Sequence, residues 1–152
     1  MNKKQITHRE LCFLAADWLH QPGRIHPASC PHVAVELVTA TQERPDVFGW
    51  NSWATVMIEV KVSRVDFLAD AKKHFRQHPD QGVGDFRFYC CPDGLIDIDE
   101  IPEEWGLLYE KDGVIRKVKD AMHQKSHHQS ERTIFASMFR REVKRKIFDY
   151  RK

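Results

Sequence analysis

The apolar run from Thr55 to Val62 constrains the fold most, because two charged residues interrupt it at alternate positions. Its β-branched residues favour a strand, and successive side chains of a strand point to opposite faces of a sheet. Glu59 and Lys61 therefore share one face. The opposite face is apolar and carries Val56, Ile58, Val60 and Val62. A carboxylate and an ammonium group in so apolar a strand are costly to bury unless each finds a partner, so the sequence predicts a polar site here.

A second acid lies upstream of this strand. Asp46 follows Pro45 and is separated from Glu59 by twelve residues. If a neighbouring strand carries Asp46, two carboxylates and the Lys61 amine converge on one place. Carboxylate oxygens are the ligands that Mg²⁺ or Mn²⁺ prefers, and such a cation can activate water for attack on a phosphodiester. The same spacing is also compatible with an ordinary Glu–Lys pair on an exposed strand face.

These residues resemble the motif of the PD-(D/E)XK nuclease superfamily, with Pro45-Asp46 followed by Glu59-Val60-Lys61. The longer string over residues 58–70, Ile-Glu-Val-Lys-Val-Ser-Arg-Val-Asp-Phe-Leu-Ala-Asp, closely resembles the MmcB-like DNA-repair proteins of that superfamily. Arg44 and the run Phe86-Arg87-Phe88-Tyr89 are also similar to that family's arrangement, and the likeness covers about residues 33–120.

The resemblance implies an α/β fold with a restriction-endonuclease-like core, in which helices flank a mixed central sheet. It also implies a metal-dependent nuclease that hydrolyses phosphodiester bonds in DNA. In this interpretation Asp46 and Glu59 bind Mg²⁺ or Mn²⁺ together with the Val60 carbonyl oxygen. Lys61 orients the attacking water or stabilises the transition state through its charge. We therefore expect Asp46, Glu59 and Lys61 to be the catalytic residues.

Two further acids are candidates for the metal site. Glu36, among valines of an expected strand, is either a third metal ligand or a solvent-facing residue. Glu10 is either a helix-borne acid near the metal or half of a capping box with Thr7, and we favour the capping role.

Several basic and hydroxyl side chains are expected to contact DNA. Ser63 caps the helix that follows the strand and can also contact a phosphate at that helix N-terminus, where Arg64 lies beside it. Arg44 is either a phosphate contact or a counter-charge to the acids. From Glu131 to Lys152 the chain has eight Lys or Arg residues against three acids, whereas its total net charge is +2. This asymmetry indicates a polyanion partner or a solvated basic face, and the expected DNA contacts there are Arg140, Arg141, Lys144 and Arg145.

Periodicity and turn residues predict a single domain over residues 1–152. In chain order, we expect a helix over 8–20, strands over 33–39, 42–51 and 54–62, a helix over 64–77, a strand over 85–91, a short element at 106–109, a strand over 114–118 and a basic helix over about 131–150.

The bulk composition is that of a soluble globular domain without a membrane span or a secretory signal, so a cytoplasmic location is expected. Four cysteines in a chain this long do not indicate a disulfide framework, and adjacent Cys90 and Cys91 should face opposite sides of a strand. The chain has no CxxC pair, and the Cys30-x-His32 spacing is unlike common structural zinc sites, so a structural zinc is not expected.

Two other functions remain open at this point. The chain could be a non-catalytic nucleic-acid-binding or adaptor protein on the same fold. It could also be a restriction-type or mobile-element endonuclease, although its length leaves little room for a separate recognition domain. The sequence does not distinguish DNA from RNA as the partner, and it leaves the oligomeric state open.

Overall fold

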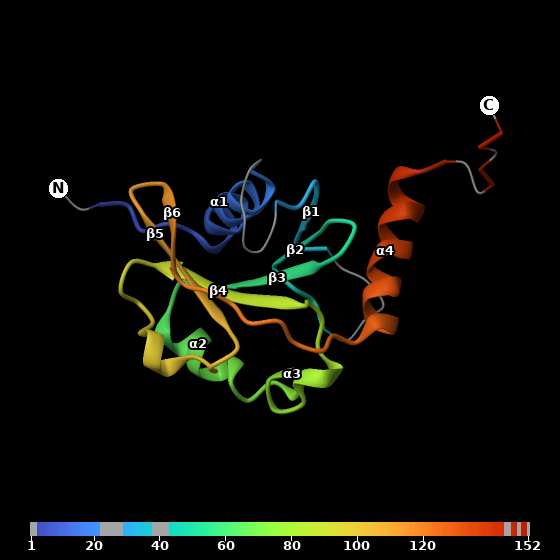
Figure 1. The fold of residues 1–152 in the computed structure, drawn as a ribbon. Coiled ribbons are helices and arrows are strands. Elements are labelled where there is room, and N and C mark those ends of the chain that lie inside the picture. Colours follow the sequence, from blue (N-terminus) through green and yellow to red (C-terminus); the bar gives the residue numbers. More distant parts are fainter. Residues whose placement is uncertain (1–2, 22–28, 38–42, 145–146, 149, 152) are drawn as a thin grey trace.

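A six-stranded mixed sheet with helices on both faces forms the centre of the protein (Figure 1). The computed structural model describes residues 3–21, 29–37, 43–144, 147–148 and 150–151. The strands are β1 His32–Val35, β2 Val47–Trp50, β3 Thr55–Val60, β4 Phe86–Pro92, β5 Gly106–Lys111 and β6 Val114–Lys119. The helices are α1 His8–His20, α2 Arg64–Asp70, α3 His74–Gln77 and α4 His128–Glu142, with 3-10 turns η1 Pro79–Gln81 and η2 Ile98–Glu100. The predicted α/β class, with helices flanking a mixed sheet, is confirmed.

The six strands follow one another across the sheet in chain order. The first three form an antiparallel meander, β4 and β5 run parallel to β3, and β6 returns antiparallel to β5. A parallel pair needs a crossover connection, and α2 and α3 supply it between β3 and β4. The predicted turn between the last two strands is present, with positive φ at Asp112 and Gly113.

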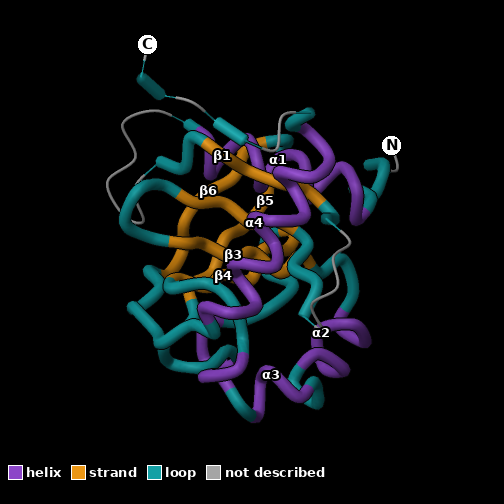
Figure 2. Tube along the Cα trace, turned by 90° about the vertical axis from the view of Figure 1, so that its right-hand side faces the viewer, coloured by secondary structure: helices purple, strands orange, loops and turns teal. Residues whose placement is uncertain are grey.

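Helix α1 covers one face of the sheet, over the antiparallel meander and β4 (Figures 1 and 2). Thr7 and Glu10 form the predicted capping box, in which Thr7 Oγ1 accepts from the Glu10 N–H and the Glu10 carboxylate accepts from the Thr7 N–H. The helix buries Leu11, Ala15, Trp18 and Leu19. Gly49 permits this close packing, because a Cβ there would lie 2.6 Å from Leu19 Cδ2.

Helices α2 and α3 lie on the opposite face (Figures 1 and 2), and α4 packs through Phe135 on the rings of Phe48 and Trp50 of β2. This second core joins side chains from the strands, α2, the segment before β5 and α4. Its largest members include Phe48, Met57, Phe67, Tyr89, Trp105, Leu107 and Ile134. Cys90 belongs to the α1-side core and Cys91 to this one, as predicted, and all four cysteines are free thiols.

The predicted helix over 64–77 is divided into two. Helix α2 ends at Asp70, and Lys73 has extended backbone with ψ 143° before α3 begins at His74. The sequence from 71 to 73 contains neither Gly nor Pro, so local propensity does not explain the break. It coincides with contacts that Lys73 and Arg76 make with buried acids, described below. Tertiary contacts therefore override the helical pattern.

Three other predicted elements are too long. The strand expected over 42–51 begins only at Val47, so Asp46 lies just before β2 and not within it, next to Pro45, which has no N–H to donate to a sheet. Strand β1 ends at Val35, and Glu36 follows it with a left-handed φ of 50°. Helix α4 ends at Glu142 instead of about residue 150, and Val143 is already extended. The ring of Phe139 in its last turn is 58% exposed, so the end of this apolar stripe has little core to pack against. Lys144 therefore lies beyond the helix, and Arg145 lies outside the described residues.

Candidate functional site

The ends of β1 and β3 and the start of β2 meet at one end of the sheet. Asp46 comes directly before β2, whereas Glu59 and Lys61 lie at the end of β3 and just beyond it. The register pairs Val47 with Ile58, which sets Asp46 opposite Glu59. Asp46 Oδ2 accepts a 2.8 Å hydrogen bond from the Val60 N–H, and Lys61 Nζ lies 3.7 Å from Glu59 Oε2. The structure thus brings together the three residues that the sequence singled out.

Glu59 is buried beside Asp46, and both the burial and the neighbouring charge change the pKa of its carboxyl group. The residue is only 3% exposed. Burial raises the pKa of the Glu59 carboxyl to about 8, and the nearby charge of Asp46 adds to the rise while Arg76 and Lys73 oppose it. Two carboxylates held this close favour any cation that can lie between them. This site is therefore suited to bind a metal ion or a basic group.

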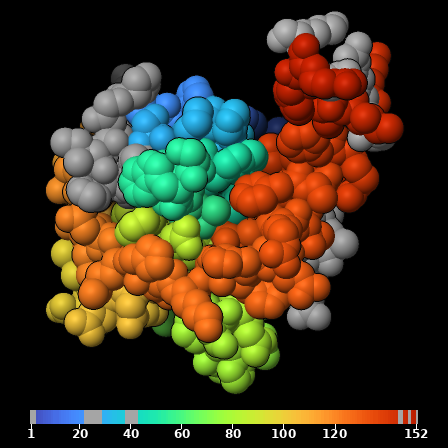
Figure 3. All heavy atoms as spheres, turned by 45° about the vertical axis from the view of Figure 1, so that its right-hand side comes forward, coloured from blue at the N-terminus to red at the C-terminus, as the bar shows by residue number. Residues whose placement is uncertain are grey.

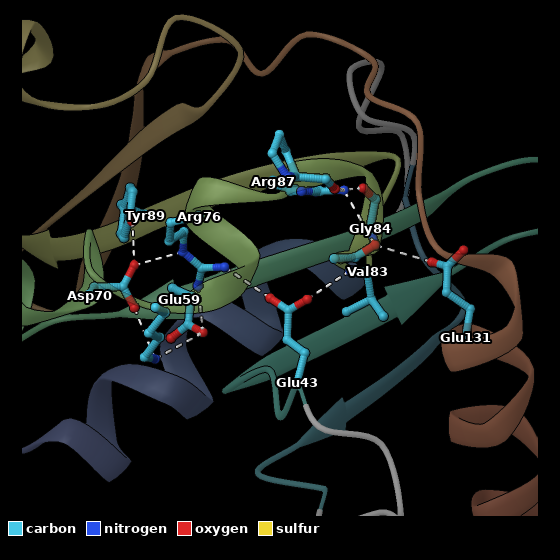
Figure 4. Close-up of polar contacts among 12 residues, drawn as sticks. Glu43, Glu59, Asp70, Arg76, Val83, Gly84, Arg87, Tyr89 and Glu131 are labelled. Carbon is cyan, nitrogen blue, oxygen red and sulfur yellow. Dashed lines mark hydrogen bonds and ion pairs between the residues drawn. The ribbon is translucent and has the colours of Figure 1, made fainter.

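Arg76 supplies such a basic group, and the sequence analysis did not predict its role. Its side chain is 4% exposed. Its guanidinium donates to Glu59 Oε1 at 2.9 Å, to Asp70 Oδ2 at 2.7 Å and to Glu43 Oε1 at 2.9 Å (Figure 4). It also lies over the Trp105 ring, 4.6 Å from the centroid. Arg76 is thus the hub of a buried ionic network.

Asp70, like Glu43, is an acid of this network that the sequence analysis did not assign to the site. Its Oδ1 lies 3.1 Å from Lys61 Nζ and 2.9 Å from Lys73 Nζ, and its Oδ2 accepts a hydrogen bond from the Tyr89 hydroxyl. Burial alone would raise the pKa of the Asp70 carboxyl, but the Arg76 charge and these hydrogen bonds hold it well below its ordinary value. Lys61 is therefore shared between Glu59 on the strand and Asp70 on α2.

The network continues from Arg76 toward α4. Glu43 Oε2 accepts from the Val83 N–H at 2.8 Å, and the next N–H, that of Gly84, donates to Glu131 Oε2 at 3.1 Å. Figure 4 shows these contacts as a row that runs from Asp70 through Arg76 and Glu43 to Glu131. The site is thereby fixed by elements that are far apart in the sequence.

A pocket of about 300 Å³ opens beside this network, and Glu59 forms part of its wall. Its basic lining residues are Arg44, Lys73 and Arg76, and Glu43, His74 and Phe75 complete it. Arg44 is exposed, and its role as a phosphate contact or as a counter-charge to the acids remains a prediction. The pocket therefore combines buried acids with basic groups.

Glu36 lies on the other side of Asp46, toward α1. Its N–H donates to the Asp46 carbonyl oxygen at 2.8 Å, which ties the two residues together. Its carboxylate, however, accepts from Arg9 at 2.7 Å and lies 3.5 Å from His8 Nδ1. Glu36 is thus near Asp46, but its side chain is engaged with α1 and its role as a third ligand remains a prediction.

The expected DNA contacts are distributed over separate parts of the surface. Ser63 caps α2 as predicted and accepts from the Asp66 N–H at 3.2 Å. Arg64 donates to both carboxylate oxygens of Glu100 and to the Leu95 carbonyl oxygen, so it braces the segment after β4.

Arg140, Arg141 and Lys144 are exposed at and beyond the end of α4. Figure 3 shows α4 against the segment around β2, with the C-terminal end of the helix projecting from the body of the protein. The packing of Phe135 on Trp50, with ring centroids 5.0 Å apart, fixes the first half of this helix. The basic residues therefore lie on a projecting surface.

Comparisons with known proteins show the fold and leave the function open. No protein-family model matches the chain, and no curated protein matches it significantly. Among solved structures, the chain is similar to the SPO1766 protein, a protein of unknown function from Silicibacter pomeroyi. The match has a TM-score of 0.60 and 21% sequence identity, and it covers 98% of this chain and 100% of that one. Within the described residues, no helix is both long enough and apolar enough to cross a membrane.

Proposed function

We propose that this chain is a metal-dependent nuclease of the DNA-repair type, related to MmcB-like proteins and built on a PD-(D/E)XK core. One observation carries the proposal. Asp46 directly before β2 and Glu59 at the end of β3 are opposed, with Lys61 3.7 Å from Glu59. The strand order supports it, because a helix, an antiparallel meander, a helical crossover and a parallel fourth strand follow the order that the resemblance implies.

The residues present fit a hard divalent cation. Asp46 and Glu59 supply carboxylate oxygens, and burial together with the neighbouring Asp46 charge raises the pKa of Glu59. With the Val60 carbonyl oxygen they would hold Mg²⁺ or Mn²⁺, which lowers the pKa of water and neutralises charge on a phosphate. Lys61, held between Glu59 and Asp70, keeps its ammonium group directed at this place and can orient a nucleophilic water.

In this proposal the basic residues that line the pocket bind the substrate. Arg44 and Lys73 are exposed at its wall and would attract the DNA backbone, which adds salt-dependent affinity without reading sequence. The basic end of α4 would extend this interaction beyond the site.

A second candidate function follows from Arg76. Its guanidinium contacts Glu59, Asp70 and Glu43 and so already supplies a cation to the acids. A chain in which Arg76 takes the place of the metal would bind nucleic acid on the same fold without cutting it. Cleavage and binding must therefore be measured separately.

The deciding experiment follows cleavage of labelled single- and double-stranded DNA in single turnover, with Mg²⁺, Mn²⁺ or EDTA, and measures DNA binding in parallel. We expect metal-dependent cleavage that Lys61→Met abolishes while binding persists. Lys72→Met is the matched control, because it makes the same substitution at an exposed position that does not line the pocket. Binding without cleavage under every metal would favour the non-catalytic candidate, and cleavage that survives both Lys61→Met and Glu59→Gln would refute the site.

A further inference from the structure

A second group of metal-ligating side chains lies on the α1 side of Asp46. His8 and Cys12 are one helical turn apart and share a face of α1. His8 Nε2 lies 3.4 Å from Asp46 Oδ2 and 4.0 Å from Cys12 Sγ. One ligand atom from each of the three residues lies within 4.8 Å of the other two. An imidazole, a thiol and a carboxylate therefore meet at one point between the helix and the sheet.

The spacing of these atoms suits a tetrahedral ion. Zn²⁺ binds sulfur, nitrogen and oxygen at about 2.0–2.3 Å, so neighbouring ligands of a tetrahedral site lie roughly 3.3–3.6 Å apart. The His8–Asp46 pair is already at this separation, at 3.4 Å. The Cys12 sulfur lies 4.0 Å from His8 Nε2 and within 4.8 Å of the Asp46 ligand oxygen, so it must move toward both to complete the site.

The surroundings also orient His8 as a ligand. Its Nδ1 lies 3.5 Å from Glu36 Oε1, and Arg9 holds the other oxygen of that carboxylate at 2.7 Å. Nδ1 also lies 3.7 Å from Cys12 Sγ. A proton on Nδ1 would face this carboxylate and would leave the electron pair of Nε2 free, and a carboxylate beside the second ring nitrogen is common among metal-bound histidines.

We propose that His8, Cys12 and Asp46 form a site for Zn²⁺ or a similar transition-metal ion, with Glu36 as the residue that orients His8. Three protein ligands leave the fourth position open to water or substrate. The thiolate distinguishes this site from one for Mg²⁺, which selects oxygen ligands. The inference does not depend on the nuclease proposal, although Asp46 is common to both sites.

Cobalt(II) is the probe for this site, because it replaces Zn²⁺ and reports a bound thiolate by a charge-transfer band in the near ultraviolet. Metal-free, reduced full-length protein is titrated with Co²⁺ and then with Zn²⁺. We expect a thiolate band that saturates at one cobalt ion per chain, with the visible bands of a tetrahedral ion, and loss of both when Zn²⁺ displaces Co²⁺.

The variants assign the ligands. Cys12→Ser should abolish the thiolate band, and His8→Gln should weaken cobalt affinity at least tenfold without disturbing the fold, since the His8 side chain is 40% exposed. Glu36→Gln should keep the band while lowering affinity by about 10–100-fold, because it alters only the orientation of His8. Cys91→Ala and His32→Gln are the controls, because Cys91 lies in the opposite core and His32 on β1, and both should bind like the wild type.

A wild-type protein without a thiolate band, or a band that persists in Cys12→Ser, would overturn the inference. The outcome is also separable from that of the nuclease proposal. A thiolate band in a chain that never cuts DNA would support this site and refute the nuclease, whereas Mg²⁺-dependent cleavage by a chain without the band would do the reverse.

Discussion

Arg76 donates a 2.9 Å hydrogen bond to Glu59, so a cation from α3 holds the acid at the end of β3. This contact links the candidate site to the packing of the fold, because the same guanidinium also donates to Asp70 and Glu43. The side chain of Arg76 is 4% exposed, and a buried charge of this kind is tolerated only while its partners remain. The network therefore has consequences for stability as well as for chemistry.

Replacing Arg76 should destabilise the fold strongly. Arg76→Met leaves three buried acids without their shared cation, and breaking a buried ion pair by removing one partner typically costs about 3–5 kcal/mol. Denaturant unfolding followed by circular dichroism measures the change in the free energy of unfolding. Lys72→Met, at an exposed position, should change it by less than about 0.5 kcal/mol. Equal effects of the two substitutions would mean that the network does not stabilise the fold.

Tyr89 should contribute more to stability than a comparable tyrosine elsewhere. Its hydroxyl donates to the Asp70 carboxylate, whereas the Tyr109 hydroxyl donates to the neutral Ile96 carbonyl oxygen. A hydrogen bond to a charged group contributes about 1.5–3 kcal/mol, and one to a neutral group about 0.5–1.5 kcal/mol. Thermal and denaturant unfolding of Tyr89→Phe and Tyr109→Phe therefore should rank the first as the more damaging. The reverse order would contradict the geometry of the Asp70 contacts.

The Glu59 carboxyl should make stability depend on pH near neutrality. Its pKa is raised from an ordinary 4.5 to about 8 in the folded protein, so the folded state binds the proton more tightly than the unfolded state. Its contribution is complete below the unfolded pKa and is lost as the pH rises toward about 8. Asp70 acts in the opposite sense and only in acid, because its pKa is lowered.

Comparison of the wild type with Glu59→Gln from about pH 5 to about pH 9 isolates this contribution. The free energy of unfolding of the wild type should fall relative to that of the variant across this range. A difference that stays constant would show that Glu59 is ionised throughout.

The basic end of α4 should contribute to DNA affinity in a salt-dependent way. Arg140→Gln with Arg141→Gln removes two exposed charges from the last turn of α4. Each lost phosphate contact should lower the slope of log affinity against log salt by about 1, similarly for every DNA sequence. Fluorescence anisotropy at several salt concentrations measures this slope. Lys111→Gln with Arg116→Gln makes the same charge change on the β5–β6 hairpin, and an equal loss there would indicate only a general charge effect.

The sequence predicts the strands of the site better than it predicts their ionic partners. Alternation in the run around Glu59 and Lys61 is a local property, and the structure has this strand as Thr55–Val60 with the two residues beside each other. The capping boxes and turns are also local, which explains why the starts of α1 and α2 are correct.

Arg76 and Glu43 could not be predicted in this way. Asp70 and Arg76 are six residues apart, a spacing at which an unbroken helix would not pair them, and their contact depends on the break between α2 and α3. Glu43 reaches Arg76 from another part of the chain. The end of α4 was missed for a related reason, because helix length there depends on packing that the apolar pattern does not reveal.

The central claim is that Asp46 and Glu59 jointly bind a divalent cation, and a manganese soak of a crystal tests it most directly. Anomalous scattering locates Mn²⁺ without reference to activity. We predict a peak within about 2.0–2.6 Å of a carboxylate oxygen of each residue, with Lys61 beside it. Saturating Mn²⁺ with no peak between these carboxylates, and Arg76 still bridging Glu59 and Asp70, would contradict the claim.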